Sequence, residues 1–474
     1  MTNTRDERRA ALILAAGKGT RMKSDQPKVL CEVLFKPMLQ WVIEACRGAR
    51  IDSICAVTGY GAGMVEERLR SSGIEIETAL QAEQLGTGHA VMCARDFLER
   101  HRGGDVVILG GDAPFIDPET IERSYGQHRR EKNAITIITA CPDDPTGYGR
   151  IVRGGSGVER IVEHKDATGE ELRIREINSG AYWFAVDNLL EVLGELGNAN
   201  AQGEYYLPDT IALTLEKGRK VGAYISDNAD VVLGANSRLQ LMQLNQIANR
   251  RVIERLMDEG VEFLSLDGIL IAPDSKVGRG TVILPGTILR DGAEIGEDCM
   301  IGPNSLVSGT KIGDGSRFNS SQCYASEIGE GVSIGPFCHI RPNTRIKDHV
   351  HIGDFVEVKN AVIGDGTHIA HLTYVGDSDV GERVNFGGGS AIANYNGVTK
   401  SRSVIGDDVF LGCHTVLVSP VKVGDRAYTA AGSIITEEIP ADALAIARER
   451  QVNKEGYNEK LRGAARRDAP RKER

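Results

Sequence analysis

The chain is poor in aromatic residues and contains no long apolar run. Phe, Trp and Tyr together make up 5% of its 474 residues, and no stretch approaches the roughly 20 consecutive apolar residues of a membrane-spanning helix. The N-terminus, MTNTRDERRA, is charged, and the apolar run after it leads directly into a glycine-rich turn. That pattern favours a buried strand over a secretory signal, so we expect no association with a membrane.

Paired cysteines and an excess of positive charge are also missing. The nine Cys residues are odd in number and form no C-x-x-C pair, which indicates free thiols in a reducing, cytoplasmic location. Lys and Arg number 56 against 66 Asp and Glu, a formal net charge of −10. This balance argues against nucleic acid as a partner, although a local basic pocket can still bind an anionic substrate.

The length predicts two domains. In residues 1–236, short apolar runs alternate with amphipathic stretches, which is typical of a Rossmann-like α/β sheet with helices on both faces. The runs are 11–15, 53–58, 106–109 and 134–139, and the stretches include 39–49 and 87–99. Residues 237–260 contain no Pro and no internal Gly, and they predict one long linker helix.

From residue 277 the aliphatic residues recur every six positions. One block is Val277, Ile283, Leu289, Ile295, Ile301 and Val307; a second is Ile328, Ile334, Ile340, Ile346, Ile352 and Val358; a third is Ile405, Leu411, Leu417, Val423, Thr429 and Ile435. Neither a helix nor a flat strand has this period, whereas a hexapeptide parallel β-helix does, because each face of its triangular coil contributes one inward side chain. We predict this fold for residues 261–452.

Two stretches interrupt the six-residue count. We expect residues 371–379 and 394–403 to leave the coil as loops, and such interruptions commonly carry function. Residues 453–474 form a basic C-terminal tail, and its segment KLRGAARRDAPRKER, residues 460–474, is expected to be disordered.

The first apolar run continues into LAAGKGTRM, residues 14–22. Glycines allow a tight turn whose N–H groups can face phosphate oxygens, and Lys18, Arg21 and Lys28 add positive charge beside them. The segment is neither a Walker loop nor a dinucleotide fingerprint, so by itself it could equally be an ordinary strand–helix turn. Asp112 follows the run 106–109, where a carboxylate suits a hard cation beside a triphosphate, or simply a turn before Pro114.

His371 lies in GDGTHIAHLTY, where the count is interrupted. An imidazole suits a general base that takes a proton from an amine attacking a thioester. Glu357, one coil earlier, could orient it. A lone His in a repeat can also be a satisfied surface group.

Several motifs, in order along nearly the whole chain, resemble one enzyme family. LAAGKGTRM followed by Pro27-Lys28-Val29-Leu30 is similar to the signature of sugar-nucleotide pyrophosphorylases. QAEQLGTGHA, DPTGYGRIV, IVEHKDAT, EINSG, QGEYYLPD and HLTYVGD are similar to segments of the bifunctional N-acetylglucosamine-1-phosphate uridyltransferase/glucosamine-1-phosphate acetyltransferases. The resemblance implies a nucleotidyltransferase domain followed by a left-handed β-helix acetyltransferase domain.

The resemblance also implies residues for uridyl transfer. Asp112 and Asn236 would hold Mg²⁺, although Asn236 alone also fits a helix cap. Substrate contacts to UTP and N-acetylglucosamine 1-phosphate would come from Leu14, Ala15, Ala16, Gly17, Lys28, Gln81, Gly86, Thr87, Gly149, Glu163, Asn178 and Asn236. Gly110 departs from the family, which often has a polar residue there.

For acetyl transfer, the resemblance makes His371 the base. Glucosamine 1-phosphate would be held by Arg341, Lys359, Tyr374, Asn385 and Lys400, and acetyl-CoA by Gly388, Asn394, Tyr395, Cys413, Ala431 and Arg448. Gly388, Ser390 and Cys413 depart from the usual Ala, Thr and Ser, but none removes a charge or the base. A stack of flat coils has no deep cleft, and the family implies a homotrimer whose acetyltransferase site lies between subunits.

Two other functions stay open at this level. One is a nucleotidyltransferase whose β-helix serves only assembly. The other is a metal hydratase, because hexapeptide helices can bind zinc through His residues, and this half of the chain is rich in His.

Overall fold

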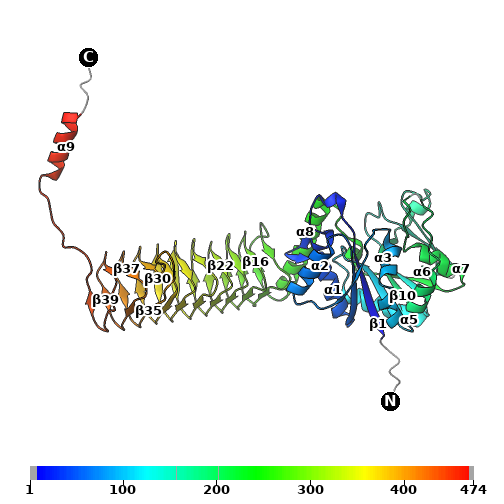
Figure 1. Cartoon of the computed structure of the whole chain (residues 1–474), viewed down its shortest axis with the longest axis horizontal. Helices are drawn as coiled ribbons and strands as arrows, with labels where there is room; N and C mark the ends of the chain where they lie inside the picture. The colour runs from blue at the N-terminus through cyan, green and yellow to red at the C-terminus, as the bar shows by residue number, and fades with distance from the viewer. Residues whose placement is uncertain (1–7, 156, 201, 469–474) are drawn as a thin grey trace, which may run out of the picture. The chain divides into compact units, whose positions relative to one another are not determined.

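The structure is a computed structural model that describes residues 8–155, 157–200 and 202–468. The chain divides into two compact units, one ending at Ile253 and one beginning at Glu254 (Figure 1). No helix among the described residues is long and apolar enough to cross a membrane.

The first unit is built on one mixed sheet with the strand order β11-β7-β10-β6-β1-β4-β5. Its strands are β1 (Arg9–Ala15), β4 (Ser53–Thr58), β5 (Glu77–Leu80), β6 (Asp105–Gly110), β7 (Ile135–Ala140), β10 (Ile177–Ala185) and β11 (Val221–Ile225), with β8 (Arg150–Gly154) and β9 (Gly157–Val162) as an attached hairpin and β2 (Glu32–Val33) and β3 (Lys36–Pro37) as a separate one. β10 runs antiparallel to β6 and β7, and the other strands along this path pair in parallel.

Helices cover both faces of this sheet. They are α1 (Met38–Gly48), α2 (Ala62–Ser71), α3 (Thr87–Cys93), α4 (Arg95–Arg100), α5 (Pro118–Glu131), α6 (Val186–Leu193) and α7 (Asp209–Glu216). Successive residues of β1 enter two different cores: Ala10 and Leu12 pack in one, Ala11 and Ile13 in the other. This alternation follows from the two-residue period of a strand buried on both faces. The expected single helix over 87–99 is two helices, because the chain turns at Ala94.

The linker helix is α8 (Arg238–Asp258). Ser237 caps its first turn, since the Ser237 hydroxyl accepts from the Gln240 N–H at 3.3 Å. Gly260, with φ of +93°, follows its last turn. The Asn245 side chain accepts from the Leu34 N–H at 2.8 Å, which ties this helix to the first unit.

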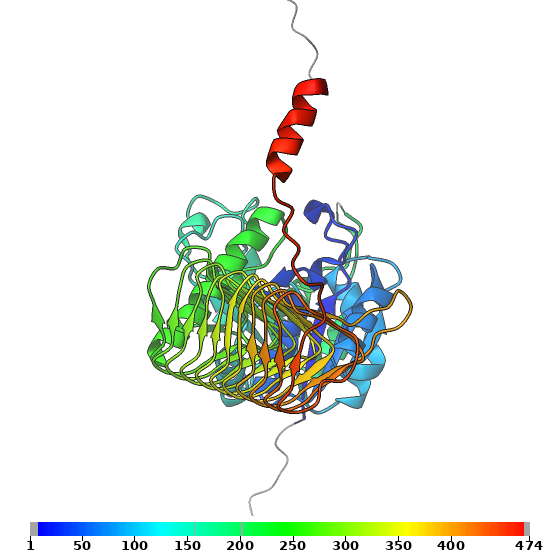
Figure 2. The same ribbon diagram turned by 90° about the vertical axis from the view of Figure 1, so that its left-hand side faces the viewer.

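The second unit is a parallel β-helix with three sheets, whose coils overlie one another in the nearly end-on view of Figure 2. The first sheet contains β12 (Glu262–Phe263), β15 (Val282–Ile283), β18 (Met300–Ile301), β21 (Arg317–Phe318), β24 (Ser333–Ile334), β27 (His351–Asp354), β30 (His368–His371), β33 (Asn385–Phe386), β36 (Phe410–Leu411), β39 (Tyr428–Thr429) and β41 (Leu444–Ala445). The second contains β13 (Leu270–Ile271), β16 (Ile288–Arg290), β19 (Leu306–Ser308), β22 (Gln322–Tyr324), β25 (His339–Ile340), β28 (Glu357–Lys359), β31 (Tyr374–Gly376), β34 (Ala391–Ala393), β37 (Val416–Val418) and β40 (Ile434–Ile435). The third contains β14 (Lys276–Val277), β17 (Glu294–Ile295), β20 (Lys311–Ile312), β23 (Glu327–Ile328), β26 (Arg345–Ile346), β29 (Val362–Ile363), β32 (Ser378–Val380), β35 (Ser403–Ile405) and β38 (Lys422–Val423).

The residues at six-residue spacing form the core of this β-helix. Every predicted inward position is buried; Ile283, Ile301 and Ile340, for example, are 0% exposed. Glycine follows some of these residues because the coils stack closely: a Cβ on Gly278 would lie 2.5 Å from the backbone of Gly296. The sequence prediction of a hexapeptide β-helix is confirmed.

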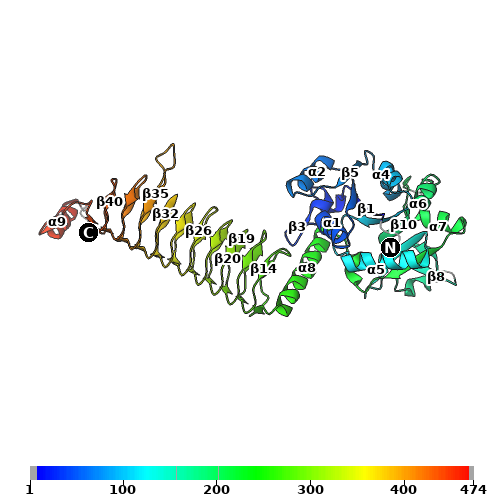
Figure 3. The ribbon, with the colours of Figure 1, turned by 90° about the horizontal axis from the view of Figure 1, so that it is seen from below.

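One of the two expected interruptions is wrong. Residues 371–379 do not leave the coil, because β30, β31 and β32 continue the three sheets there and Ile369, Val375 and Val380 point inward. The count shifts because two corners are each a residue shorter: Val358 and Ile363 are five positions apart, and so are Val375 and Val380. Residues 394–403 do form a loop between β34 and β35, which stands out from the stack in Figure 3.

The expectation of a disordered tail is also wrong for the described residues. Tyr457–Asp468 form the helix α9. This stretch contains neither Pro nor β-branched residues, and its single Gly463 does not prevent a helix. Residues 469–474 lie outside the described part of the chain.

Candidate functional sites

The glycine-rich loop of the first unit leaves the carboxyl end of β1. Leu14 and Ala15 end the strand, and Ala16 and Gly17 start the loop, where a Cβ on Gly17 would meet no atom within 4 Å. Gly19 packs directly on Lys28: at its φ of +61°, a Cβ would lie 2.7 Å from the Lys28 Cβ. The loop therefore brings open backbone and a lysine side chain to the edge where α/β sheets bind ligands.

Lys28 joins the two predicted metal ligands. Its ammonium forms an ion pair with Asp112 and donates to the Asn236 Oδ1 at 2.9 Å. Because Ser237 caps α8, the Asn236 side chain is not used as the helix cap. A carboxylate and an amide oxygen thus converge on one cation, and such oxygen ligands suit a hard divalent metal.

The proposed uracil-contacting segment folds back on the chain before α7. Gln81, 3% exposed, donates to the Gly86 carbonyl at 3.0 Å, and the Thr87 hydroxyl accepts from the Leu207 N–H at 3.1 Å. Gly86, at φ +101°, has no room for a side chain, since a Cβ would lie 2.5 Å from the Tyr205 carbonyl oxygen. The structure therefore brings Gln81, Gly86 and Thr87 together.

The predicted sugar contacts also come together. The Asn178 N–H donates to the Gly149 carbonyl at 2.9 Å, and a Cβ on Gly149 would lie 3.2 Å from the Glu163 Oε1. The Asn178 amide donates to the Tyr182 hydroxyl at 2.8 Å. Burial raises the pKa of Tyr182, so the hydroxyl stays neutral and orients Asn178. Tyr182 is a residue that sequence reasoning missed.

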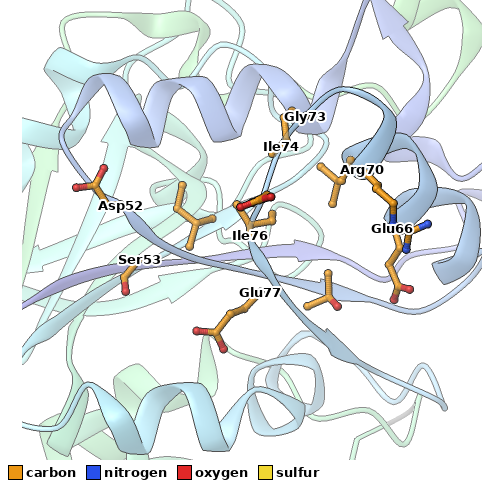
Figure 4. Close-up of a pocket in the computed structure, with 12 residues that line it drawn as sticks. Asp52, Ser53, Glu66, Arg70, Gly73, Ile74, Ile76 and Glu77 are labelled. Carbon is orange, nitrogen blue, oxygen red and sulfur yellow. The ribbon is translucent and has the colours of Figure 1, made fainter.

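A hollow elsewhere in the first unit is distinct from this site. Figure 4 shows it between α2 and the strands β4 and β5, lined by Asp52, Ser53, Glu66, Arg70 and Glu77 among others. Ser53 and Glu77 begin their parallel strands, so the hollow lies at the edge of the sheet opposite the glycine-rich loop.

In the second unit, the cationic residues gather at the corner between the second and third sheets, which we call the phosphate corner (residues 341–344, 359–361, 377 and 393–402). The Arg341 guanidinium donates to Glu357 at 2.8 Å, and this hydrogen bond raises the pKa of Arg341. The Lys359 pKa is lowered, first by the neighbouring Lys400 ammonium and then by burial, while Asp377 opposes the shift. Tyr374 lies on the next coil, paired in register with Glu357.

His371 lies one strand away, at the corner between the first and second sheets, which we call the base corner (residues 335–338, 353–356, 371–373, 387–390 and 412–415). Its Nδ1 is 3.3 Å from the Asp354 Oδ1, its register partner on β27. The expectation that Glu357 orients His371 is not met in the chain, because Glu357 pairs with Arg341. The sequence analysis did not identify Asp354. It lies 17 residues before His371, which is one coil of the β-helix, and this spacing could have identified it.

The predicted acetyl-CoA residues divide between these two corners. The base corner continues from His371 through Gly388 and Cys413, because backbone hydrogen bonds join successive coils there. The Gly389 N–H donates to the His371 carbonyl at 3.3 Å, and the His414 N–H donates to the Gly388 carbonyl at 2.9 Å. On the next coil, the Gly432 N–H donates to the Cys413 carbonyl at 2.8 Å. Ala431 and Arg448 extend this ridge, since a Cβ on Gly412 would lie 2.6 Å from the Ala431 N and one on Gly432 3.7 Å from Arg448. Asn394 and Tyr395 instead lie in the loop at the phosphate corner. Asn385, which was predicted to hold glucosamine 1-phosphate, does not lie at the phosphate corner but on the outer face of the first sheet, beside His368.

The comparisons with known proteins agree with both units. The family model for nucleotidyl transferases matches residues 10–234, a bacterial transferase hexapeptide model of six repeats matches 274–309, and a GMPPB C-terminal domain model matches 323–435. The chain is 48% identical over 452 residues to the bifunctional protein GlmU of Clostridium perfringens, covering 95% of this chain and 99% of that protein. The chain belongs to the GlmU family.

Other GlmU proteins are similarly close. The identity is 46% over 448 residues with that of Acetivibrio thermocellus (94% of this chain, 96% of the relative) and 46% over 452 residues with that of Clostridium beijerinckii (95% and 98%). As a member of this family, the chain is a bifunctional enzyme of UDP-N-acetylglucosamine synthesis, a uridyltransferase in its first unit and an acetyltransferase in its hexapeptide unit.

The two alternative functions therefore fall away. A β-helix used only for assembly is at odds with a bifunctional family. A metal hydratase is likewise at odds with membership of this family. The rings of His351 and His368 lie close to each other, with centroids 5.8 Å apart. The pKa of His351 is lowered, mainly by burial and to a smaller extent by the nearby His368 and His371.

Proposed function

We propose that the first unit transfers uridylyl from UTP to N-acetylglucosamine 1-phosphate, with Mg²⁺ held by Asp112 and Asn236. The observation that carries this is the convergence of both oxygen ligands on the Lys28 ammonium beside the glycine-rich loop. Mg²⁺ takes one or two protein ligands and completes its shell with water and phosphate oxygens, so two ligands suffice. When bound, the ion would neutralise phosphate charge.

The residues of this unit position the reactants. A phosphate oxygen of the sugar phosphate attacks the α-phosphorus of UTP, and the bond to the departing pyrophosphate breaks. Lys28 and the loop N–H groups bind the triphosphate, Gln81, Gly86 and Thr87 bind the uracil end, and Gly149, Glu163 and Asn178 bind the sugar. Positioning and charge neutralisation carry most of the rate of such a transfer.

We infer that the second unit acetylates glucosamine 1-phosphate with acetyl-CoA. Arg341, Lys359 and Lys400 supply the charge for a phosphomonoester, and Tyr374 and Asn385 contact the sugar. The ridge of Gly388, Cys413, Ala431 and Arg448 offers a surface for acetyl-CoA that leads to His371. A thioester delivered along it would arrive next to the base.

The acetyl-transfer step uses His371 as the base. The amine of glucosamine 1-phosphate attacks the thioester carbonyl, a C–N bond forms, and His371 accepts the amine proton. The C–S bond then breaks, and the proton passes from the imidazolium to the departing CoA thiolate. The Asp354 carboxylate, 3.3 Å from Nδ1, offsets the positive charge that forms on the ring.

The acetyl-transfer site is incomplete in one chain, and we infer a homotrimer that completes it. Asn394 and Tyr395 lie a strand away from the ridge that the other acetyl-CoA residues form. Near His371, the base corner carries an exposed apolar set: Phe337 and Phe355 stack with centroids 5.4 Å apart, and Leu372 is 68% exposed. Such a set beside a site is typical of a subunit interface.

We also infer that the enzyme works in the cytoplasm, where UTP and acetyl-CoA are available and thiols stay reduced. All nine Cys are free in the structure, as expected in that compartment.

One experiment tests both activities. The purified chain is incubated with glucosamine 1-phosphate, acetyl-CoA, UTP and Mg²⁺, and each component is omitted in turn. We expect UDP-N-acetylglucosamine only with all four, N-acetylglucosamine 1-phosphate without UTP, and no product without acetyl-CoA. Formation of the UDP-sugar in the presence of EDTA would contradict the metal assignment.

A further inference from the structure

A buried carboxylate at the phosphate corner has no role in the two reactions described above. Asp377, between β31 and β32, has a side chain that is only 9% exposed. Its Oδ1 accepts from the Asn360 amide at 2.6 Å, its Oδ2 accepts from the Asn394 amide, and Oδ2 is 3.8 Å from the Lys359 Nζ. A buried charge requires such partners, so these contacts are specific.

The same residue holds both ends of the projecting loop. Its side chain binds Asn394, where the loop begins, and its carbonyl accepts from the Ser403 N–H, where the loop ends, at 3.1 Å. The Asp377 N–H donates to the Lys359 carbonyl at 2.9 Å. The loop between these ends carries Tyr395 and Lys400, and its tip contains Val398, which is 86% exposed. Together with Arg402, which donates to the Asn360 carbonyl at 2.8 Å, the attachment at Asp377 helps to set where Lys400 lies relative to Lys359.

Charge gives a second reason for a carboxylate here. Arg341, Lys359 and Lys400 lie close enough for each of the other two to lower the pKa of Lys359. Glu357 offsets Arg341, and Asp377 offsets the lysines. Burial by itself raises the pKa of Asp377, but the hydrogen bonds from Asn360 and Asn394 and the two lysines outweigh it and hold it below its usual range. Asp377 is thus ionised at neutral pH, where the lysines are also charged.

We propose that Asp377 is a positioning residue for acetyl transfer, which anchors the 394–403 loop and so sets Lys400 beside Lys359 to receive the substrate phosphate. This rests on the proposed acetyl transfer. Asp377 acts through Lys359 and the loop and does not touch the substrate.

The test compares Asp377→Asn with Asp408→Asn. The single side-chain oxygen of Asn cannot replace both carboxylate oxygens, so the hydrogen bond from Asn394 or the one from Asn360 is lost, together with the charge that faces Lys359. We expect the KM for glucosamine 1-phosphate to rise about tenfold, the effect of losing one charge-assisted hydrogen bond. Asp408 pairs with the exposed Arg383 at the third corner, so Asp408→Asn should leave the KM unchanged.

The pH profile separates positioning from general structural damage. The groups around Lys359 are Lys400, Arg341 and Asp377. Removing the carboxylate takes away an influence that raises the Lys359 pKa, so Lys359 loses its charge at lower pH. In Asp377→Asn, the alkaline rise of the KM for the sugar phosphate should move to lower pH. If the pH dependence of the KM is the same in Asp377→Asn and wild type, Asp377 does not support the charge of Lys359.

Limited trypsin cleavage tests the anchor without any activity. The loop contains Lys400 and Arg402, and mass spectrometry would identify cuts after them. We expect faster cleavage at these two sites in Asp377→Asn while cleavage elsewhere and uridyl transfer stay unchanged. If wild-type enzyme shows no acetyl transfer, the proposed function fails, but this readout still decides whether Asp377 holds the loop.

Asn360→Ala provides a variant that keeps the buried carboxylate. It removes the 2.6 Å hydrogen bond to Asp377. It should raise both the KM for glucosamine 1-phosphate and the rate of loop cleavage, but by less than Asp377→Asn does. A folded Asn360→Ala or Asp377→Asn enzyme with wild-type KM and wild-type cleavage would show that Asp377 does not position the loop.

Discussion

At the scale of single residues, acetyl transfer depends on the imidazole of His371. The amine of glucosamine 1-phosphate is mostly protonated at neutral pH and has to lose a proton before it forms the amide. We predict that His371→Ala lowers kcat for acetyl transfer by about 10²–10⁴-fold, the usual contribution of a positioned base. Arg341, Lys359 and Lys400 remain, so the KM for the sugar phosphate should change little.

Two comparisons sharpen this prediction. Uridyl transfer by the same His371→Ala protein serves as the internal control. Asp354→Asn keeps an acceptor atom near the ring but removes its charge, so it should slow acetyl transfer less, by about tenfold. A His371→Ala enzyme that keeps more than a tenth of the wild-type acetyl transfer would show that another group is the base, with Glu357 the next candidate.

The corresponding residue in the first unit is Asp112. We predict that Asp112→Ala abolishes uridyl transfer, because the carboxylate beside the polyanionic substrate is lost and Lys28 loses its ion pair. Mn²⁺ binding, followed by electron paramagnetic resonance, should weaken in parallel, whereas acetyl transfer should stay at the wild-type rate. Near-normal uridyl transfer at saturating Mg²⁺ would exclude Asp112 as a ligand.

At the scale of elements, the stability of the β-helix comes from its inward aliphatic column. Ile301 and Met300 are neighbours on β18, 0% and 43% exposed. Ile301→Ala should reduce the free energy of opening these coils by about 2–5 kcal/mol, from lost burial and a cavity. Met300→Ala should change it by roughly 0.5 kcal/mol or less.

Amide hydrogen exchange measures this difference locally. The amides of β15, β18 and β21 should exchange faster in Ile301→Ala, and those of the first unit should not change, because each coil contacts mainly its neighbours. Equal exchange rates in the two variants would mean that the six-residue column is not the main stabilising element.

At the scale of the whole molecule, the two activities should separate. We predict that residues 1–260, which include α8, retain uridyl transfer, because both cores of the first unit and its whole candidate site lie within them. The fragment is assayed with UTP and N-acetylglucosamine 1-phosphate against the full chain. A folded fragment that forms no UDP-sugar would show that its site is incomplete.

Assembly should affect only acetyl transfer. Phe355→Asp adds a charge to the exposed stack of the base corner and should convert a trimer into a smaller species, as measured by light scattering after size exclusion. Acetyl transfer should fall with it, while uridyl transfer persists. The exposed Phe410, which stacks on Tyr428 at 5.4 Å outside this corner, offers Phe410→Asp as the control. A fully active monomeric Phe355→Asp protein would contradict a site between subunits.

The sequence by itself determined the class of each unit. In the second unit, a six-residue period indicates a β-helix, because each face of a coil has to bury one side chain. In the first unit, buried strands that alternate with amphipathic stretches indicate an α/β sheet. The likeness of HLTYVGD and LAAGKGTRM to known segments located His371 and the phosphate loop. These features are local in the chain, so they can be read without coordinates.

Only the tertiary structure decided which distant side chains meet. Asp354 rather than Glu357 faces His371, because register across a coil pairs residues 17 apart, and Arg341 takes Glu357 instead. Residues 371–379 stay in the coil because two corners, each a residue shorter, absorb the break in the count. The same packing buries Asp377 against both ends of the 394–403 loop. Such contacts depend on how coils stack, which a one-dimensional period does not encode.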